Sequence, residues 1–147
     1  GSVQPDAVIN KHIDDIIREK APVIDVSECP DIMPTIAVLG TSLNKILKII
    51  GGRRLRAKES DRIAAVAAGL ENLGVRTIQS ADGLMVFGTG KISGGTVDAC
   101  NDHRIAMAFA TLCSVAENDI VITGAGSVSK SYPRFFEDIK MLGGIVI

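Results

Sequence analysis

The sequence predicts an α/β fold of the α+β kind, in which strands and helices alternate and a hairpin closes each repeat. Apolar residues recur at helical spacing in some segments and alternate at strand spacing in others. The same order of elements occurs twice along the 147 residues. Aromatic residues make up only 3% of the chain and glycines number 15, which suits close packing of helices on a sheet.

The first half of the chain predicts helices and strands in alternation, followed by a hairpin. The expected segments are a helix over 9–19, a strand over 23–26, a helix over about 32–39, a strand over 47–50, a helix over about 58–73, and strands over 75–78 and 84–87. Pro34 fits its helix only in the first turn, Gly74 suits a helix end, and Asp82-Gly83 is typical of a hairpin turn.

The second half predicts a similar series. The expected segments are a helix over 103–116, a strand over 120–122, a glycine-containing loop up to Lys130, a helix ending at 141–144 and a strand over 145–147. Ser131 is expected to cap the last helix, with Pro133 near its first position.

A shift of 69 residues places Leu73-Gly74 on Leu142-Gly143. The spacing therefore predicts two units, at roughly 22–88 and 94–147, within one domain over 1–147. The second unit stops at its first hairpin strand and the first lacks a clear beginning. We expect the chain to be a truncated domain of a larger protein.

Composition argues against three classes: nucleic-acid-binding proteins with a strong overall charge, membrane-spanning proteins and proteins with a histidine-based metal site. The net charge of −1 gives no global field that favours nucleic acid, and no apolar run is long enough to span a membrane. Three cysteines without ligand-like spacing are expected to be reduced thiols, and two histidines are too few for a histidine-based metal site. A cytoplasmic protein without a metal or cofactor is expected.

Basic residues are concentrated between residues 44 and 62. Seven cations face two carboxylates there: Lys45, Lys48, Arg53, Arg54, Arg56, Lys58 and Arg62 against Glu59 and Asp61. A discrete anion site and a solvated charged face are both compatible with this pattern. Lys58, Glu59 and Arg62 directly precede an apolar helical stripe, so they are expected to lie together at the N-terminus of a helix. The free backbone N–H groups there attract anions.

The other helix starts carry related residues. Asp102 is expected to cap a helix with His103 and Arg104 in its first turn, Lys130 precedes a third helix, and Asp31 precedes a fourth. Taken singly, each residue has an ordinary explanation. Asp31 and Asp102 are typical helix caps, His103 a capping or packing histidine, Arg104 a surface arginine and Lys130 a solvated lysine.

Together the helix starts favour a binding site. Arg62, Arg104 and Lys130 would hold a compact, multiply charged anion such as a phosphorylated carboxylate. Asp31 and Glu59 would handle protons in that positive field.

Two long motifs sharpen this interpretation. LRAKESDR at 55–62 and NDHRIAM at 101–107 resemble the 3-phosphoshikimate 1-carboxyvinyltransferases, the enolpyruvylshikimate-phosphate synthase family of the shikimate pathway. Segments 29–34 and 129–133 match the same family in order and spacing. The resemblance implies the enolpyruvyl transferase fold, with this chain similar to about two of its six units.

The resemblance also implies a reaction. The family moves the enolpyruvyl group of phosphoenolpyruvate onto the 5-hydroxyl of shikimate 3-phosphate and releases phosphate, without a metal or cofactor. By resemblance, Arg62, Arg104 and Lys130 bind phosphoenolpyruvate, and His103 supports that pocket.

The remaining site residues are assigned by resemblance as well. Asp31 and Lys58 contact shikimate 3-phosphate, with Asp31 as the base for its hydroxyl, and Glu59 exchanges the proton at the methylene carbon. The family's opposite, N-terminal domain is absent from this chain and is its expected partner. We expect no turnover from this chain alone.

Two other functions remain open from the sequence. One is the sister enolpyruvyl transferase, which acts on a UDP-sugar, although the two long motifs belong to the shikimate enzyme. The other is a non-catalytic α/β module that binds anions or RNA. The basic segment lacks interleaved aromatics, and Tyr132 is the only tyrosine.

Overall fold

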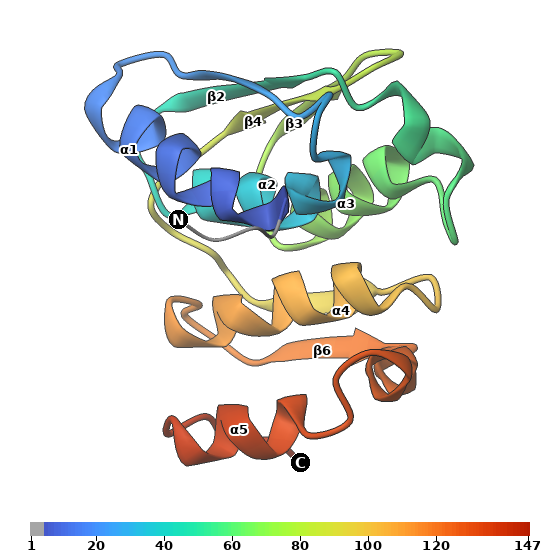
Figure 1. The fold of residues 1–147 in the computed structure, drawn as a ribbon. Coiled ribbons are helices and arrows are strands. Elements are labelled where there is room, and N and C mark those ends of the chain that lie inside the picture. The colour runs from blue at the N-terminus through green and yellow to red at the C-terminus, as the bar shows by residue number, and fades with distance from the viewer. Residues whose placement is uncertain (1–4) are drawn as a thin grey trace.

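The computed structural model describes residues 5–147, and side chains from residue 7 onward (Figure 1). Its α-helices are α1 (Ile9–Arg18), α2 (Met33–Thr41), α3 (Arg62–Asn72), α4 (His103–Ala110) and α5 (Phe135–Met141). Its strands are β1 (Val23–Asp25), β2 (Ile46–Ile50), β3 (Thr77–Gln79), β4 (Leu84–Phe87), β5 (Gly95–Asp98) and β6 (Ile120–Thr123). Short 3₁₀ helices are η1 (Pro5–Val8), η2 (Pro30–Ile32), η3 (Arg53–Ala57), η4 (Thr111–Ser114) and η5 (Ala125–Lys130). The predicted mixture of helices and strands is confirmed.

The larger sheet has the strand order β1-β2-β4-β3, with β1 parallel to β2 and the other neighbours antiparallel. The predicted β3–β4 hairpin is confirmed, and Ser80 N–H donates to the Gly83 carbonyl at 3.0 Å across its turn. Strands β5 and β6 form a separate parallel pair. Figure 1 shows α1, α2 and α3 on one side of the larger sheet, with α4, β6 and α5 following in successive layers.

One continuous hydrophobic core joins these layers. Leu47 from β2, Ile36 from α2, Leu70 from α3 and Phe109 from α4 are all fully buried. Gly69 allows α3 to approach α4, because a Cβ at that position would lie 2.5 Å from the Phe109 ring. The shared core therefore fixes the N-terminus of α3 relative to that of α4.

The start of α3 differs from the prediction. The helix begins at Arg62 rather than Lys58, so Lys58 and Glu59 precede it. Lys58 has an extended backbone, and the Asp61 side chain caps the helix by accepting the Ala64 N–H at 3.0 Å. An aspartate cap competes well for a helix start, which explains the shift.

Several predictions in the second half are also wrong. The segment 103–116 is α-helical only to Ala110 and continues as η4. The last helix begins at Phe135, because Ser131 closes η5 through a backbone bond to Val128 and makes no side-chain cap. Residues 145–147 pair with no strand among residues 5–147. No helix in this range has the length and apolar content needed to cross a bilayer.

The basic segment 44–62 divides into residues with separate roles. Lys45 Nζ donates to three carbonyl oxygens at the end of α1, at 2.8–3.0 Å, and so holds that helix on β2. Arg56 pairs with Asp61 at 2.9 Å. Lys58 and Arg62 instead meet carboxylates near η2. Four of the seven cations of this segment therefore already have partners within the fold.

Candidate functional site

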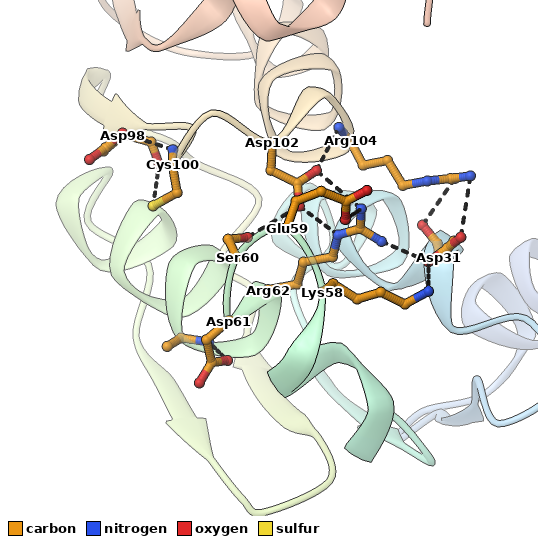
Figure 2. A network of polar contacts seen from close by, with 11 residues as sticks. Asp31, Lys58, Glu59, Ser60, Asp61, Arg62, Asp98, Cys100, Asp102 and Arg104 are labelled. Carbon is orange, nitrogen blue, oxygen red and sulfur yellow. Dashed lines mark hydrogen bonds and ion pairs between the residues drawn. The ribbon is translucent and has the colours of Figure 1, made fainter. Parts of the chain in front are cut away.

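The N-termini of α3 and α4 lie beside one another and next to η2 (Figure 2). Each helix is capped by an aspartate, Asp61 for α3 and Asp102 for α4, where the Arg104 backbone N–H donates to Asp102 at 3.0 Å. Arg62 is the first residue of α3 and His103 the first of α4. The two helix mouths singled out in the sequence thus meet in the fold.

Six charged side chains at this junction form what we call the charged cluster: Asp31, Lys58, Glu59, Arg62, Asp102 and Arg104. Arg62 occupies its centre, and its side chain is only 2% exposed. Its Nη1 donates to Asp31 Oδ1, and its Nη2 donates to Glu59 Oε2, both at 2.7 Å. Its Nε donates to Asp102 Oδ2, also at 2.7 Å. Arg62 is therefore held by three carboxylates.

Asp102 is fully buried yet remains ionised. Burial pushes the pKa of Asp102 upward, but the hydrogen bonds and charge of Arg62 outweigh burial, helped by bonds from the Arg104 N–H and Ser60. The net pKa of Asp102 lies below its ordinary value. Burial likewise lowers the pKa of Arg62, while Asp102, Glu59 and Asp31 raise it by more. The pair is thus a charged salt bridge, joining α3 to α4.

This lowered pKa predicts a loss of stability in acid. A carboxylate whose pKa falls on folding contributes stability that is complete above its unfolded pKa and is lost as the pH drops toward the folded one. Because the ordinary value for Asp102 is 3.8, we expect the free energy of unfolding to decline steeply below that pH. Urea titrations between about pH 6 and pH 2 should show a shallower decline in Asp102→Asn than in Asp82→Asn, an exposed control. Equal slopes in the two variants would contradict the assignment.

Asp31 contacts all three cations of the cluster. Its carboxylate contacts Arg62, the Lys58 Nζ at 3.5 Å and the Arg104 Nη2 at 3.4 Å. The sequence interpretation of Asp31 as a helix cap is wrong, because Asp31 lies within η2 and α2 has no side-chain cap. Asp31, Lys58 and Arg104 are each about one-third exposed, so a ligand can reach this part of the cluster.

The three cations and three carboxylates of the cluster balance in formal charge. An anion that binds Arg62 must therefore replace carboxylate oxygens already in place. Glu59 is the most exposed carboxylate of the cluster, at 54%, and Asp31 is 31% exposed, whereas Asp102 is fully buried. Glu59 and Asp31 can turn away from Arg62, while Asp102 cannot.

A cavity of about 170 Å³ opens beside Asp31 and Arg104, between α2 and α4. Its remaining lining residues are Thr35, Met107, Ala108, Thr111 and Phe135. A more open hollow lies over Tyr132, Pro133, Arg134 and Asp138 and includes none of the predicted site residues. The smaller cavity is the relevant one, because charged groups of the cluster form its wall.

Lys130 and His103 take part in none of the ion pairs of the cluster. Lys130 lies at the end of η5 rather than at an α-helix start, so that prediction is wrong. Its side chain is exposed and joins no ion pair within residues 5–147. His103 lies in the first turn of α4, as predicted, and is half-buried. Ion pairs with Asp31 link Arg62 and Arg104, and among the described residues no ion pair links Lys130 to either of them.

The sequence interpretation missed two members of the network. Asp102 was expected only to cap α4, but it also binds the Arg62 guanidinium, 40 residues away in the chain. Ser60 donates its hydroxyl to Asp102 Oδ2 at 3.1 Å. No local spacing signals either contact, because both depend on how α3 packs against α4.

Comparison with known proteins places these features in a family. A sequence profile described as EPSP synthase (3-phosphoshikimate 1-carboxyvinyltransferase) matches residues 4–139. The 3-phosphoshikimate 1-carboxyvinyltransferase of Clostridium acetobutylicum is 45% identical over 124 residues, which are 84% of this chain and 29% of that protein. The Clostridium kluyveri enzyme of the same name is 45% identical over 122 residues, 83% of this chain and 29% of that protein.

A solved structure of EPSP synthase from Acinetobacter baumannii has a similar fold over most of this chain. Its TM-score is 0.75 at 31% sequence identity, over 79% of this chain and 28% of that one. The chain thus spans less than a third of the length of the relatives it matches.

Proposed function

Because the chain belongs to the EPSP synthase family, we propose that it forms part of an enzyme that transfers the enolpyruvyl group of phosphoenolpyruvate to the 5-hydroxyl of shikimate 3-phosphate, with release of phosphate. We place it as about two of the six units of the enolpyruvyl transferase fold, at 22–88 and 94–147, in a cytoplasmic protein. The opposite domain of the same enzyme is its proposed partner.

The convergence of Arg62 and Arg104 at two adjacent helix N-termini carries this proposal. Guanidinium groups bind carboxylate and phosphate oxygens through paired N–H donors. Phosphoenolpyruvate offers both kinds of oxygen. Arg62, Arg104 and Lys130 are proposed to bind it, with His103 supporting the pocket. Lys130 would join them when the ligand is present.

The exposed carboxylates supply proton chemistry. Glu59 is proposed to protonate the methylene carbon of phosphoenolpyruvate while the 5-hydroxyl of shikimate 3-phosphate adds to the neighbouring carbon and Asp31 takes the hydroxyl proton. The resulting intermediate loses phosphate as a proton leaves the new methyl group for Glu59. Lys58 and Asp31 are proposed to contact shikimate 3-phosphate.

Binding begins with an exchange of anions at Arg62. In this structure Asp31 and Glu59 hold the two Nη atoms of Arg62, the positions that a ligand anion needs. When ligand oxygens replace them, both carboxylates are released close to the reacting atoms. The same exchange would thus bind the substrate and free the groups that transfer protons.

A chimeric enzyme tests the proposed function. The matching 124 residues of the Clostridium acetobutylicum enzyme are replaced by those of this chain, and phosphate release is measured with phosphoenolpyruvate and shikimate 3-phosphate. We expect steady turnover that depends on both substrates, whereas the isolated chain should release none. A folded chimera without turnover, or turnover by the isolated chain at an enzymatic rate, would contradict the proposal.

A further inference from the structure

Asp102 has no acceptor position left for a substrate. Its Oδ1 accepts the Arg104 backbone N–H at 3.0 Å and the Arg62 Nη2 at 3.3 Å. Its Oδ2 accepts the Arg62 Nε at 2.7 Å and the Ser60 hydroxyl at 3.1 Å. A carboxylate offers about four lone-pair sites, and all four are in use. Asp102 is also fully buried, so it acts on a ligand only through its neighbours.

The contact with Arg62 determines which way the guanidinium faces. Asp102 binds the edge formed by Nε and Nη2. This leaves Nη1 and the other N–H of Nη2 directed at Asp31 and Glu59, the oxygens that a ligand would replace. A long arginine side chain loses rotamer freedom when it is ordered, and here that loss has occurred before ligand binding.

The same carboxylate joins three segments of the site. It caps α4 through the Arg104 N–H, holds the first side chain of α3, and binds Ser60 in the segment that also carries Glu59 (Figure 2). One buried carboxylate therefore bridges the Arg62 side chain and the backbone of Arg104.

We propose that Asp102, supported by Ser60, is the positioning residue of the anion site: it orients the Arg62 guanidinium relative to Arg104 before the ligand arrives. This inference rests on the proposed function, because it assumes that these arginines bind the anionic substrate. Asp102 itself touches no substrate.

The variant Asp102→Asn replaces the carboxylate with a neutral amide. A positioning role and simple electrostatics predict opposite changes in its affinity for anions. Removing a negative charge beside Arg62 would by itself strengthen anion binding. Loss of positioning weakens anion binding, because Arg62 must then be ordered by the ligand. Asparagine keeps the size of the side chain and is as good a helix cap as aspartate, so α4 retains its start.

The experiment is a titration with inorganic phosphate, followed by NMR of the chain labelled with ¹⁵N at arginine. Asp102→Asn is expected to bind phosphate about five- to tenfold more weakly than the unmodified chain, since ordering a long side chain carries such a cost. In this variant the chemical shift of the Arg62 Nε–H should move away from its value in the unmodified chain, where the group is hydrogen-bonded to the Asp102 carboxylate. Glu28→Gln, which removes an exposed charge three residues before Asp31, should leave that signal unchanged and should not weaken binding.

Ser60→Ala provides a second test that keeps the charge of Asp102. It should weaken phosphate binding about two- to threefold, and the double variant should be little weaker than Asp102→Asn because the residues act together. Equal or tighter binding in both single variants, with an unchanged Arg62 signal, would overturn the positioning role. If the unmodified chain bound no phosphate, the proposed function would fail, and the Arg62 signal alone would decide whether Asp102 orients the side chain.

Discussion

Arg62→Met is expected to lower the free energy of unfolding by about 3–5 kcal/mol, the usual cost of leaving one partner of a buried ion pair behind. Asp102 would remain buried at the start of α4, without the cation that keeps it ionised. Methionine preserves much of the apolar volume of the arginine stem, so the loss would report mainly on charge. Urea denaturation followed by circular dichroism measures it.

Two further variants distinguish the cost of leaving Asp102 unpaired from the effect of removing any arginine. Arg134→Met removes an arginine whose side chain is 69% exposed, and its effect should stay within about 0.5 kcal/mol. Adding Asp102→Asn to Arg62→Met should restore part of the lost stability, because the orphaned charge disappears. If Arg62→Met were no more destabilising than Arg134→Met, Arg62 would not be buried among carboxylates as described.

Glu59→Gln in the chimeric enzyme is expected to reduce turnover by about 10²- to 10⁴-fold, the contribution typical of a general acid–base group. Glutamine can still accept a hydrogen bond from Arg62, but it cannot exchange a proton with the methylene carbon. The KM for phosphoenolpyruvate should change far less than kcat. Steady-state phosphate release with both substrates gives the two constants.

Glu137→Gln is the matched control for this variant. Glu137 lies on α5, is largely exposed and pairs only with Arg134 among the described residues, so turnover should be unaffected. Retention of at least a tenth of the activity in Glu59→Gln would remove Glu59 from the proton-transfer role and leave it as a ligand of Arg62.

Local patterns were sufficient to predict much of the fold. Apolar residues at helical spacing predict α1, the Asp-Gly turn predicts the β3–β4 hairpin, and Asp102 is the predicted cap of α4. These features depend on residues only a few positions apart. The apolar stripe alone predicts too early a start for α3, because the Asp61 cap begins the helix at Arg62 and the backbone at Lys58 is extended.

The site was predicted less completely, because its geometry depends on contacts between distant segments. The helix-mouth motifs indicated Arg62, Arg104, Asp31 and Glu59, and the structure brings these four together. The burial of Arg62 follows from the packing of α3 on α4, and so does the binding of its N–H groups by carboxylates. The role of Lys45 at the end of α1, almost thirty residues away, is equally invisible in the sequence.

A phosphoenolpyruvate titration of the ¹⁵N-arginine-labelled chain shows whether Arg62 and Arg104 form one anion site. The side-chain signals of Arg62 and Arg104 should move together with a single midpoint, and inorganic phosphate should compete. Signals of Arg134 on α5 should stay in place. Movement of other arginines with Arg62 and Arg104 unchanged, or separate midpoints for these two, would mean that they do not form one site.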